Sequence, residues 1–273
     1  MITLNHEVVR TRGGALAMRS LDAGEVMHPG VGPLVEAQQL YVRQSRLSER
    51  LLAGAAAGNA ALTLFDVGLG AGSNALAARA ASEQAPAHAA RLHLLSFERD
   101  LGALELALGH GDVFGLDGEP AAAARALLQH GQHETPRTSW RLERGELLDS
   151  LTRAQATPAD VIFWDPFSPK ANPGLWTVGA FAAARRAAGP RCTLFTYSAS
   201  TTTRVALLLA GWAVGIGDGI GDKAATTAAA VLATDLAQPL DQRWLARLSR
   251  SQAPLPADAP ADAIARVGAA PQF

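Results

Sequence analysis

Apolar residues between positions 34 and 56 recur every three or four residues, with charged residues between them. Side chains at this spacing lie on one face of a helix. Pro33 suits the first position of such a helix, and Gly54 lies near its end. The pattern therefore predicts one amphipathic helix over residues 34–56. Its apolar face consists of Leu34, Ala37, Leu40, Tyr41, Leu47 and Leu51.

From residue 61 onward, short apolar runs alternate with helix-forming segments. Strands are predicted at residues 61–67, 92–97, 138–142, 161–164 and 191–197. Helices are predicted at residues 73–83, 101–108, 120–132, 174–188 and 202–210. Such alternation is typical of a parallel sheet covered by helices on both faces. Two further predicted strands, residues 212–216 and 225–234, are joined by a glycine-rich turn, so we expect them to pair antiparallel.

These elements predict an α/β fold with a Rossmann-like, mostly parallel sheet of seven strands and a terminal antiparallel hairpin. Residues 1–33 alternate in polarity and contain several glycines, which indicates a short strand or hairpin extension. Residues 250–273 are rich in Ala, Pro and Asp, which indicates an extended surface tail. We therefore expect an N-terminal extension and packing helix over residues 1–56, a core over 57–240 and a C-terminal tail over 241–273.

The composition fits one α/β domain with additions at its ends, since 48% of the 273 residues are apolar. The net charge of −1 gives no global attraction to nucleic acid, so an RNA substrate would require basic residues gathered on one face. Cys192 is the only cysteine, which favours a reducing cytoplasm and gives no cluster for zinc. The sequence predicts no signal peptide, no membrane span and no metal site.

A glycine loop connects the strand at 61–67 to the helix at 73–83. Gly68, Gly70 and Gly72 let the backbone turn sharply and approach a ligand closely. Asn74, near the start of the helix, is a predicted cofactor-binding residue, and either it or its neighbour Ser73 can cap that helix. The free N–H groups at such a helix start attract polar or anionic groups. The position of the loop therefore predicts a nucleotide-like cofactor.

The spacing of the loop indicates which cofactor it binds. The glycines follow a G-x-G-x-G pattern, with Asp66 two residues before the first, whereas dinucleotide sites use G-x-G-x-x-G. The pattern resembles that of class I methyltransferases, which bind S-adenosyl-L-methionine (SAM). The Asp66 carboxylate suits the amino group of the methionine moiety of SAM.

Two further carboxylates are candidates to bind the cofactor. Glu98 ends the strand that follows the loop, where an acidic side chain can accept hydrogen bonds from both ribose hydroxyls. Glu146 follows the next strand, and it either faces the adenine amino group or starts a helix.

A second loop, residues 165–176, follows the strand at 161–164. Ligands of open α/β sheets bind beyond the carboxyl ends of the strands, so Asp165 should lie beside the cofactor. A carboxylate there can accept hydrogen bonds from an amine, orient its lone pair and support the positive charge that forms on nitrogen. Asp165 is therefore the predicted catalytic residue. Phe167 and Trp176 either shape the pocket or pack in the core.

The two loops together resemble a particular family. Residues 65–74, Phe97 with Glu98, residues 165–176 and residues 217–223 are similar to the methyltransferase half of the bifunctional bacterial enzymes that make 5-methylaminomethyl-2-thiouridine in tRNA (the MnmC type). Residues 167–176 match the family loop F-[AS]-P-x-x-N-P-x-x-W. Residues 35–42 resemble more loosely the family's acidic stretch that runs into a Tyr-bearing helix.

This resemblance implies SAM-dependent methylation of the 5-aminomethyl group on the wobble uridine of tRNA, with Asp165 holding the amine nitrogen. Phe167, Lys170, Trp176 and Lys223 are the expected substrate-binding residues, and Lys223 either contacts the substrate or anchors its turn. Pro166 replaces the usual family glycine and removes a backbone N–H beside the reacting centre. The chain has no counterpart of the FAD-dependent oxidase half, so only the methyl step is expected.

Other functions remain open on the sequence alone. The near-neutral charge suits a methyltransferase for a small amine or another metabolite. An aminopropyltransferase would also have acidic residues beyond the fourth strand, but Asp66 favours a cofactor with an intact methionine end. A SAM-binding protein without catalysis would have no need of Asp165.

Overall fold

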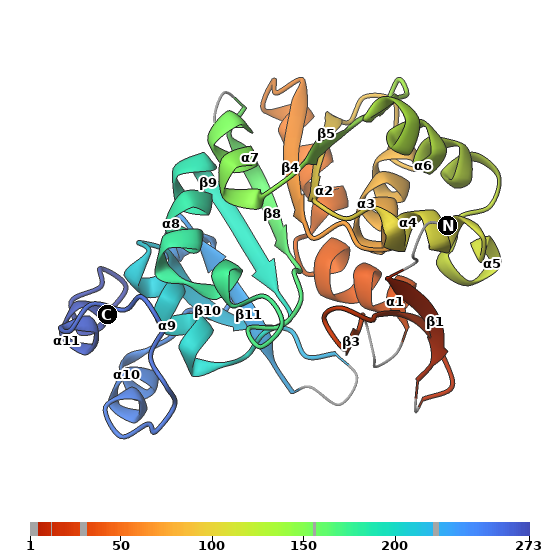
Figure 1. Ribbon diagram of the computed structural model, residues 1–273. Coiled ribbons are helices and arrows are strands. Elements are labelled where there is room, and N and C mark those ends of the chain that lie inside the picture. Colours follow the sequence, from red (N-terminus) through yellow and green to blue (C-terminus); the bar gives the residue numbers. More distant parts are fainter. Residues whose placement is uncertain (1–4, 12, 28–31, 155–156, 221–223) are drawn as a thin grey trace.

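A computed structural model describes residues 5–11, 13–27, 32–154, 157–220 and 224–273. Its central feature is an eight-stranded sheet with the strand order β10-β11-β9-β8-β4-β5-β7-β6 (Figure 1). The strands are β4 (Ala61–Val67), β5 (Arg91–Glu98), β6 (Gln132–Glu134), β7 (Thr138–Arg144), β8 (Ala159–Trp164), β9 (Ala188–Thr196), β10 (Ala213–Gly217) and β11 (Thr226–Ala230).

The five middle strands are parallel, and the chain reverses its direction of travel across the sheet between β4 and β8. It proceeds from β4 to β5 and β7, then returns to β8 and β9 on the other side of β4. At such a switch point the loops after two neighbouring strands separate and leave a crevice. The fold therefore places a crevice beyond β4 and β8. The predicted terminal hairpin is confirmed, since β10 pairs antiparallel with β11.

Each face of the sheet has its own core because successive side chains of a strand point to opposite faces. In β8, Val161 and Phe163 pack on one side, whereas Ile162 and Trp164 pack on the other. The first face is covered by η1 (Ala37–Arg43), α2 (Leu47–Ala56), α3 (Ser73–Glu83), α4 (Gly102–Leu108), α5 (Gly111–Phe114) and α6 (Gly118–His130). The second is covered by α7 (Leu147–Ala154), α8 (Val178–Ala187) and α9 (Thr201–Leu209), and α10 (Gln242–Leu248) and α11 (Ala263–Gly268) add buried residues to the same core.

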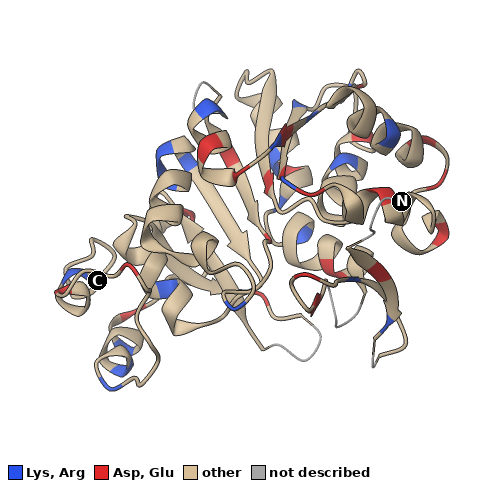
Figure 2. Ribbon diagram, viewed as in Figure 1, with Lys and Arg blue, Asp and Glu red and all other residues tan. Residues whose placement is uncertain are grey.

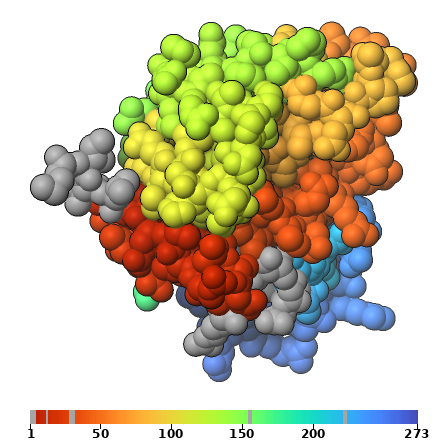
Figure 3. Space-filling model, turned by 90° about the vertical axis from the view of Figure 1, so that its right-hand side faces the viewer, coloured from red at the N-terminus to blue at the C-terminus, as the bar shows by residue number. Residues whose placement is uncertain are grey.

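The N-terminal residues form a separate antiparallel sheet of β1 (His6–Arg10), β2 (Leu16–Ser20) and β3 (Glu25–Val26), as the predicted hairpin extension implied. Figure 3 shows these residues, in red, against the yellow segment that contains α4 and α5. The small sheet therefore adds a wall beside the carboxyl ends of the central strands.

The predicted single helix over residues 34–56 is wrong. The segment is divided into α1 (Pro33–Glu36), the π-helix η1 and α2. Arg46 has a φ of 54°, a left-handed conformation that ends one helical run and starts another. Spacing alone did not reveal this break because both runs bury apolar residues on the same core.

The sheet has one more strand than predicted. The predicted helix over 120–132 ends earlier, at His130, because Gly131 takes a left-handed conformation that caps it. The chain then forms β6, which pairs antiparallel with β7 at the edge of the sheet. The polar composition of β6 gave no strand signal.

Two other predicted segments also differ. The predicted helix over 174–188 is a 3₁₀ turn, η2 (Pro173–Trp176), followed by α8, because Thr177 caps α8 by accepting a hydrogen bond from the Ala180 N–H at 3.1 Å. The extended surface tail predicted over residues 250–273 is also wrong, since this segment contains the helix α11, whose Ala263 and Val267 are buried.

A further 3₁₀ turn, η3 (Ala233–Asp235), follows β11.

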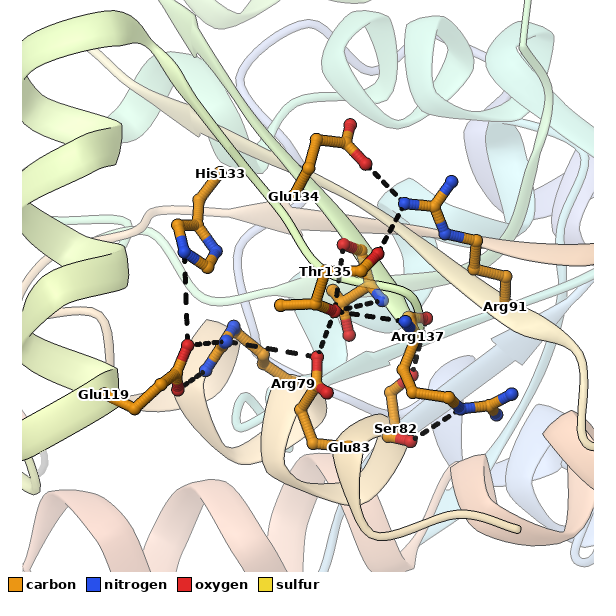
Figure 4. Close-up of polar contacts among 10 residues, drawn as sticks. Arg79, Ser82, Glu83, Arg91, Glu119, His133, Glu134, Thr135 and Arg137 are labelled. Atoms are coloured by element: carbon orange, nitrogen blue, oxygen red, sulfur yellow. Dashed lines mark hydrogen bonds and ion pairs between the residues drawn. The ribbon is translucent and has the colours of Figure 1, made fainter. Parts of the chain in front are cut away.

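A network of ion pairs and hydrogen bonds holds β6 and its connections against α3 and α6 (Figure 4). The guanidinium of Arg79, which is buried, pairs with Glu119 of α6 and lies 3.9 Å from Glu83. The hydroxyl of Thr135, after β6, donates to Glu83 at 2.6 Å. Arg91 of β5 pairs with Glu134 of β6. These side-chain contacts attach β6 to its neighbours, in addition to the few backbone hydrogen bonds that so short an edge strand can form.

Replacing Glu119 with Gln should destabilise the fold. The substitution leaves the buried guanidinium of Arg79 without its main counter-charge, so we expect the free energy of unfolding to fall by about 2 kcal/mol. Urea denaturation followed by circular dichroism measures this value. Glu105→Gln, which changes an exposed carboxylate on α4, should lie within about 0.5 kcal/mol of wild type. Equal stability of the two variants would show that the network contributes little.

Candidate active site

A cavity of about 750 Å³ lies at the switch point, between the central sheet and the N-terminal sheet. Its wall includes residues from β2, β3, α1 and the segments that follow β4, β5, β7, β8 and β9. Ligand sites commonly enclose roughly 300–1,000 Å³, so the cavity has the size of a nucleoside-bearing cofactor together with a small group.

The glycine loop and the Asp165 loop contact each other directly. A Cβ atom built on Gly68 would lie 2.6 Å from the carbonyl oxygen of Asp165, closer than real contacts allow. The φ of Gly68 is +89°, which also favours glycine. The Asp165 N–H donates to the carbonyl of Val67 at 2.9 Å. The backbone at Gly68 therefore fixes where Asp165 enters the cavity.

Asp165 lines the cavity, and Asn74 holds its carboxylate. The Asn74 side-chain amide donates to Asp165 Oδ2 at 2.6 Å. Asn74 is itself buried and does not line the cavity. The structure thus places this predicted cofactor-binding residue behind Asp165, where it orients the carboxylate.

Glu98 lines the cavity and is fixed by backbone donors. Its Oε1 accepts from the N–H groups of Arg99 at 2.8 Å and Asp100 at 3.1 Å, and its Oε2 accepts from Gly70 at 3.2 Å. Burial raises the pKa of Glu98 above its ordinary value, and these three N–H groups offset part of that rise. The hydrogen bond from Gly70 ties Glu98 to the glycine loop.

The other predicted cofactor residues are not all at the cavity surface. Gly68 and Gly70 line it, whereas Asp66 and Gly72 do not. Asp66 is fully buried beneath the loop, and its Oδ2 accepts from the Ser96 hydroxyl at 2.8 Å. Glu146 lines the cavity and lies 3.4 Å from Arg99, with most of its side chain exposed.

The predicted substrate residues occupy three kinds of position. Phe167 lines the cavity, whereas Lys170 is exposed outside the lining. Trp176 is 4% exposed and donates its indole N–H to the Phe167 carbonyl at 2.8 Å, which supports the loop from behind. Lys223 lies outside the described residues.

Several lining residues were not predicted as site residues, among them Glu25, Glu36 and Tyr197. Glu25 of β3 accepts hydrogen bonds from Ser168, from its N–H at 3.0 Å and from its hydroxyl, and so joins the N-terminal sheet to the Asp165 loop. The Tyr197 hydroxyl donates to the Pro166 carbonyl at 3.1 Å. Tyr197 follows β9, so the rule that ligands lie beyond strand ends could have found it. No sequence rule predicts that the N-terminal sheet folds over this edge.

The cavity lining is strongly acidic, with seven carboxylates and one arginine, Arg99, among the described residues. The carboxylates are Asp22, Glu25, Glu36, Glu98, Asp100, Glu146 and Asp165. Figure 2 shows that acidic residues also mark β1, β3 and α1, whereas basic residues mark α8 and α10. This lining fits a ligand with positive charge, and SAM carries such a charge on its sulfonium. Among the described residues, no group of three or more His, Cys, Asp or Glu could hold a metal ion.

The fold and this cavity are those of a Rossmann-like methyltransferase. The family model described as "S-adenosyl-L-methionine-dependent methyltransferase" matches residues 123–231. This match covers less than half of the chain, and with the curated relatives it indicates a SAM-dependent methyltransferase whose cofactor is SAM. Within the described residues, no helix is both long and apolar enough to cross a membrane.

Two curated relatives from Burkholderia carry the name "tRNA 5-methylaminomethyl-2-thiouridine biosynthesis bifunctional protein MnmC". The protein from Burkholderia thailandensis is 31% identical over 201 residues, which cover 70% of this chain and 30% of the relative. The protein from Burkholderia vietnamiensis is 30% identical over 204 residues, which cover 71% and 30%. The chain therefore spans about 30% of the length of the curated relatives that it matches.

A solved structure, that of MNMC2 from Aquifex aeolicus, is similar over almost the whole chain. Its TM-score is 0.72 and its sequence identity 25%, and the match covers 97% of this chain and 85% of the Aquifex chain. The match includes the N-terminal and C-terminal segments outside the sheet, so the additions belong to the shared architecture.

Replacing Gly68 with Ala should disrupt both the loop and the site. The new methyl group would meet the Asp165 carbonyl in a backbone conformation that already disfavours alanine, so we expect a loss of at least about 2 kcal/mol in stability and weaker SAM binding. Thermal unfolding and calorimetry test this. Gly174→Ala, at a position with open space around the Cβ, should change stability by less than about 1 kcal/mol.

The raised pKa of Glu98 predicts that SAM affinity falls as the pH is lowered. Only the ionised carboxylate can accept hydrogen bonds at both oxygens, so affinity should be full above the pKa and decline through it, beginning at a higher pH than for an ordinary glutamate. Glu98→Gln should bind SAM about 10- to 100-fold more weakly and without this pH dependence. Calorimetric titrations of wild type and Glu98→Gln with SAM at several pH values measure these affinities. Equal pH dependence in wild type and variant would contradict a role for Glu98 at the cofactor.

Proposed function

We propose that the chain transfers the methyl group of SAM to the 5-aminomethyl group on the wobble uridine of tRNA. The printed name of the Burkholderia relatives supports a substrate of this modification. The loop over residues 165–176 and the acidic cavity support an amine as the acceptor. A tRNA substrate would place the reaction in the cytoplasm.

The position of Asp165 is the single observation that carries this proposal. Its carboxylate lines the cavity beside the glycine loop, and the hydrogen bond from Asn74 fixes its orientation. A fixed carboxylate accepts hydrogen bonds from the amine, aims the nitrogen lone pair and supports the positive charge that forms on nitrogen. Asn74 and the contact with Gly68 would thus position Asp165 before the substrate enters.

We assign the cofactor side of the cavity to Gly68, Gly70, Glu98 and Glu146. Bound SAM supplies an electrophilic methyl group on a positively charged sulfur. Glu98 would accept hydrogen bonds from the ribose hydroxyls, and Glu146 would lie at the adenine end. Asp66, buried beneath the loop, would hold the loop in shape through Ser96.

On the substrate side, Phe167 would form the wall that the uracil ring contacts. Trp176 would support this wall through its hydrogen bond to the Phe167 carbonyl. The exposed ammonium of Lys170 suits a phosphate of the tRNA backbone. For Lys223 the same assignment stays a prediction from the sequence.

Methyl transfer from labelled SAM to tRNA from cells that lack the final methylation tests this function. Wild type should incorporate label at the wobble uridine. Asp165→Asn keeps the size of the side chain but removes its charge, so we expect SAM affinity within about threefold of wild type and a rate at least about 100-fold lower.

The outcomes separate the candidate substrates. Incorporation into small amines without incorporation into tRNA would replace the proposed substrate with a small-molecule amine. Full activity of Asp165→Asn would show that Asp165 does not act on the amine. Nucleoside analysis of the labelled tRNA identifies the methylated position.

A further inference from the structure

The cavity offers little to the backbone of a nucleic acid. Lys and Arg supply most of the attraction between a protein and nucleic-acid phosphates. The described part of the lining contains no lysine and a single arginine, Arg99, which lies 3.4 Å from Glu146. The net charge of −1 adds no general attraction. An RNA substrate therefore needs a basic surface outside the cavity.

A basic surface of this kind lies on α10, near the C-terminus. Residues 242–257 contain three arginines and no acidic residue. Arg243, Arg247 and Arg250 follow one another at intervals of four and three residues, so they lie on one face of α10 and of the turn that ends it. All three are exposed, and Figure 2 shows the basic residues of α10 in blue. These three residues form the arginine face of α10.

The opposite face of α10 fixes the helix on the core. Trp244 and Leu248 are 7% and 6% exposed and belong to the core of the second sheet face. The Trp244 ring stacks on Phe273 with centroids 6.2 Å apart. The Asp241 carboxylate caps the helix by accepting a hydrogen bond from the Trp244 N–H at 2.9 Å. The arginine face is therefore presented on a fixed helix, which lowers the entropy lost on binding a partner.

The chain that follows α10 runs along the sheet edge at which the cavity lies. The carbonyl of Pro254 accepts a hydrogen bond from the Thr202 hydroxyl at 2.7 Å, at the start of α9. Asp258 accepts hydrogen bonds from two N–H groups at the start of α8, at 2.9 and 2.8 Å. Both helices begin shortly after residues that line the cavity, Tyr197 before α9 and Leu175 before α8. The arginine face is thus connected to the edge that contains the site.

We propose that the arginine face of α10 binds backbone phosphates of the tRNA whose wobble nucleotide enters the cavity. This inference rests on the proposed function. The face extends about 10 Å along the helix, room for about three phosphates of one strand. A guanidinium group suits a phosphate in charge and in geometry. Phosphate contacts here would position the tRNA, whereas the cavity would select the reacting group.

The opposite edge of the sheet provides a matched control. α10 begins beside β10, since the Leu240 N–H donates to the carbonyl of Val214 at 2.9 Å. β10 is one edge of the sheet and β6 is the other. Arg125 is exposed on α6, which packs against β6. Arg125→Gln therefore removes one exposed positive charge at a distance from the arginine face.

Binding of tRNA measured at several salt concentrations tests the arginine face. The variant R243Q/R247Q/R250Q should bind tRNA at least about 10-fold more weakly near about 0.15 M salt, because three phosphate contacts are lost. Its slope of log affinity against log salt concentration should fall by about 2 to 3, whereas each single variant should lower the slope by about 1 and Arg125→Gln by less than about 0.3. Fluorescence anisotropy of labelled tRNA gives these values.

Two further measurements separate docking from folding and from the chemical step. The triple variant should unfold at the temperature of wild type and bind SAM with similar affinity, because its changed side chains are exposed and outside the cavity lining. In methyl transfer the loss should fall on KM for tRNA, by at least about 10-fold, with kcat within about threefold of wild type. If the triple variant is less stable than wild type, the three single variants are each compared with Arg125→Gln instead.

Each contrary outcome has one meaning. A triple variant with the tRNA affinity and salt slope of wild type overturns the role of the arginine face and leaves the proposed function standing. An equal loss in Arg125→Gln does the same, because net charge rather than position would then matter. So does a triple variant that loses binding to polyglutamate and keeps binding to tRNA, which would assign the face to an acidic protein. A wild type inactive on tRNA overturns the proposed function, and the docking role falls with it.

Discussion

The close backbone contact between Gly68 and Asp165 is the constraint on which the site depends. It joins the loop after β4 to the loop after β8, the two strands between which the chain reverses its direction across the sheet. Because only glycine fits there, one residue sets both the turn of the glycine loop and the entry of the Asp165 carboxylate into the cavity. Two hydrogen bonds link further cavity residues to the segment that contains the glycine loop and the start of α3. Gly70 donates to Glu98, and Asn74 donates to Asp165.

The N-terminal segment completes the site. Glu25 of the N-terminal sheet accepts hydrogen bonds from Ser168 and so holds the loop over residues 165–176 in place. Glu36 of α1 adds a further buried carboxylate to the cavity wall. The cavity therefore combines the edge of a Rossmann-like sheet with an acidic wall that the N-terminal segment supplies.

Much of the sheet could be predicted from the sequence, because buried parallel strands are short apolar runs and each is followed by a helix. The edge strand β6 could not, since its residues Gln132–Glu134 are polar and its position depends on partners such as Arg91 and Ser139. Nor could the break at Arg46, because periodic apolar positions do not report a single left-handed residue. The burial of Val267 depends on the packing of α11 against α9, which local composition does not show.

The sequence by itself determined the glycine loop, the acidic residues at the strand ends and hence the cofactor and the reaction class. These features are short continuous stretches that come directly after apolar strands, so a local pattern reveals them. The tertiary structure alone decided which of these residues reach the cavity. Asp66 and Asn74 lie behind it, whereas Glu25, Glu36 and Tyr197 line it. The reason is physical: residues far apart in the chain converge only when helices and a second sheet pack on the central one, and no local pattern encodes that packing.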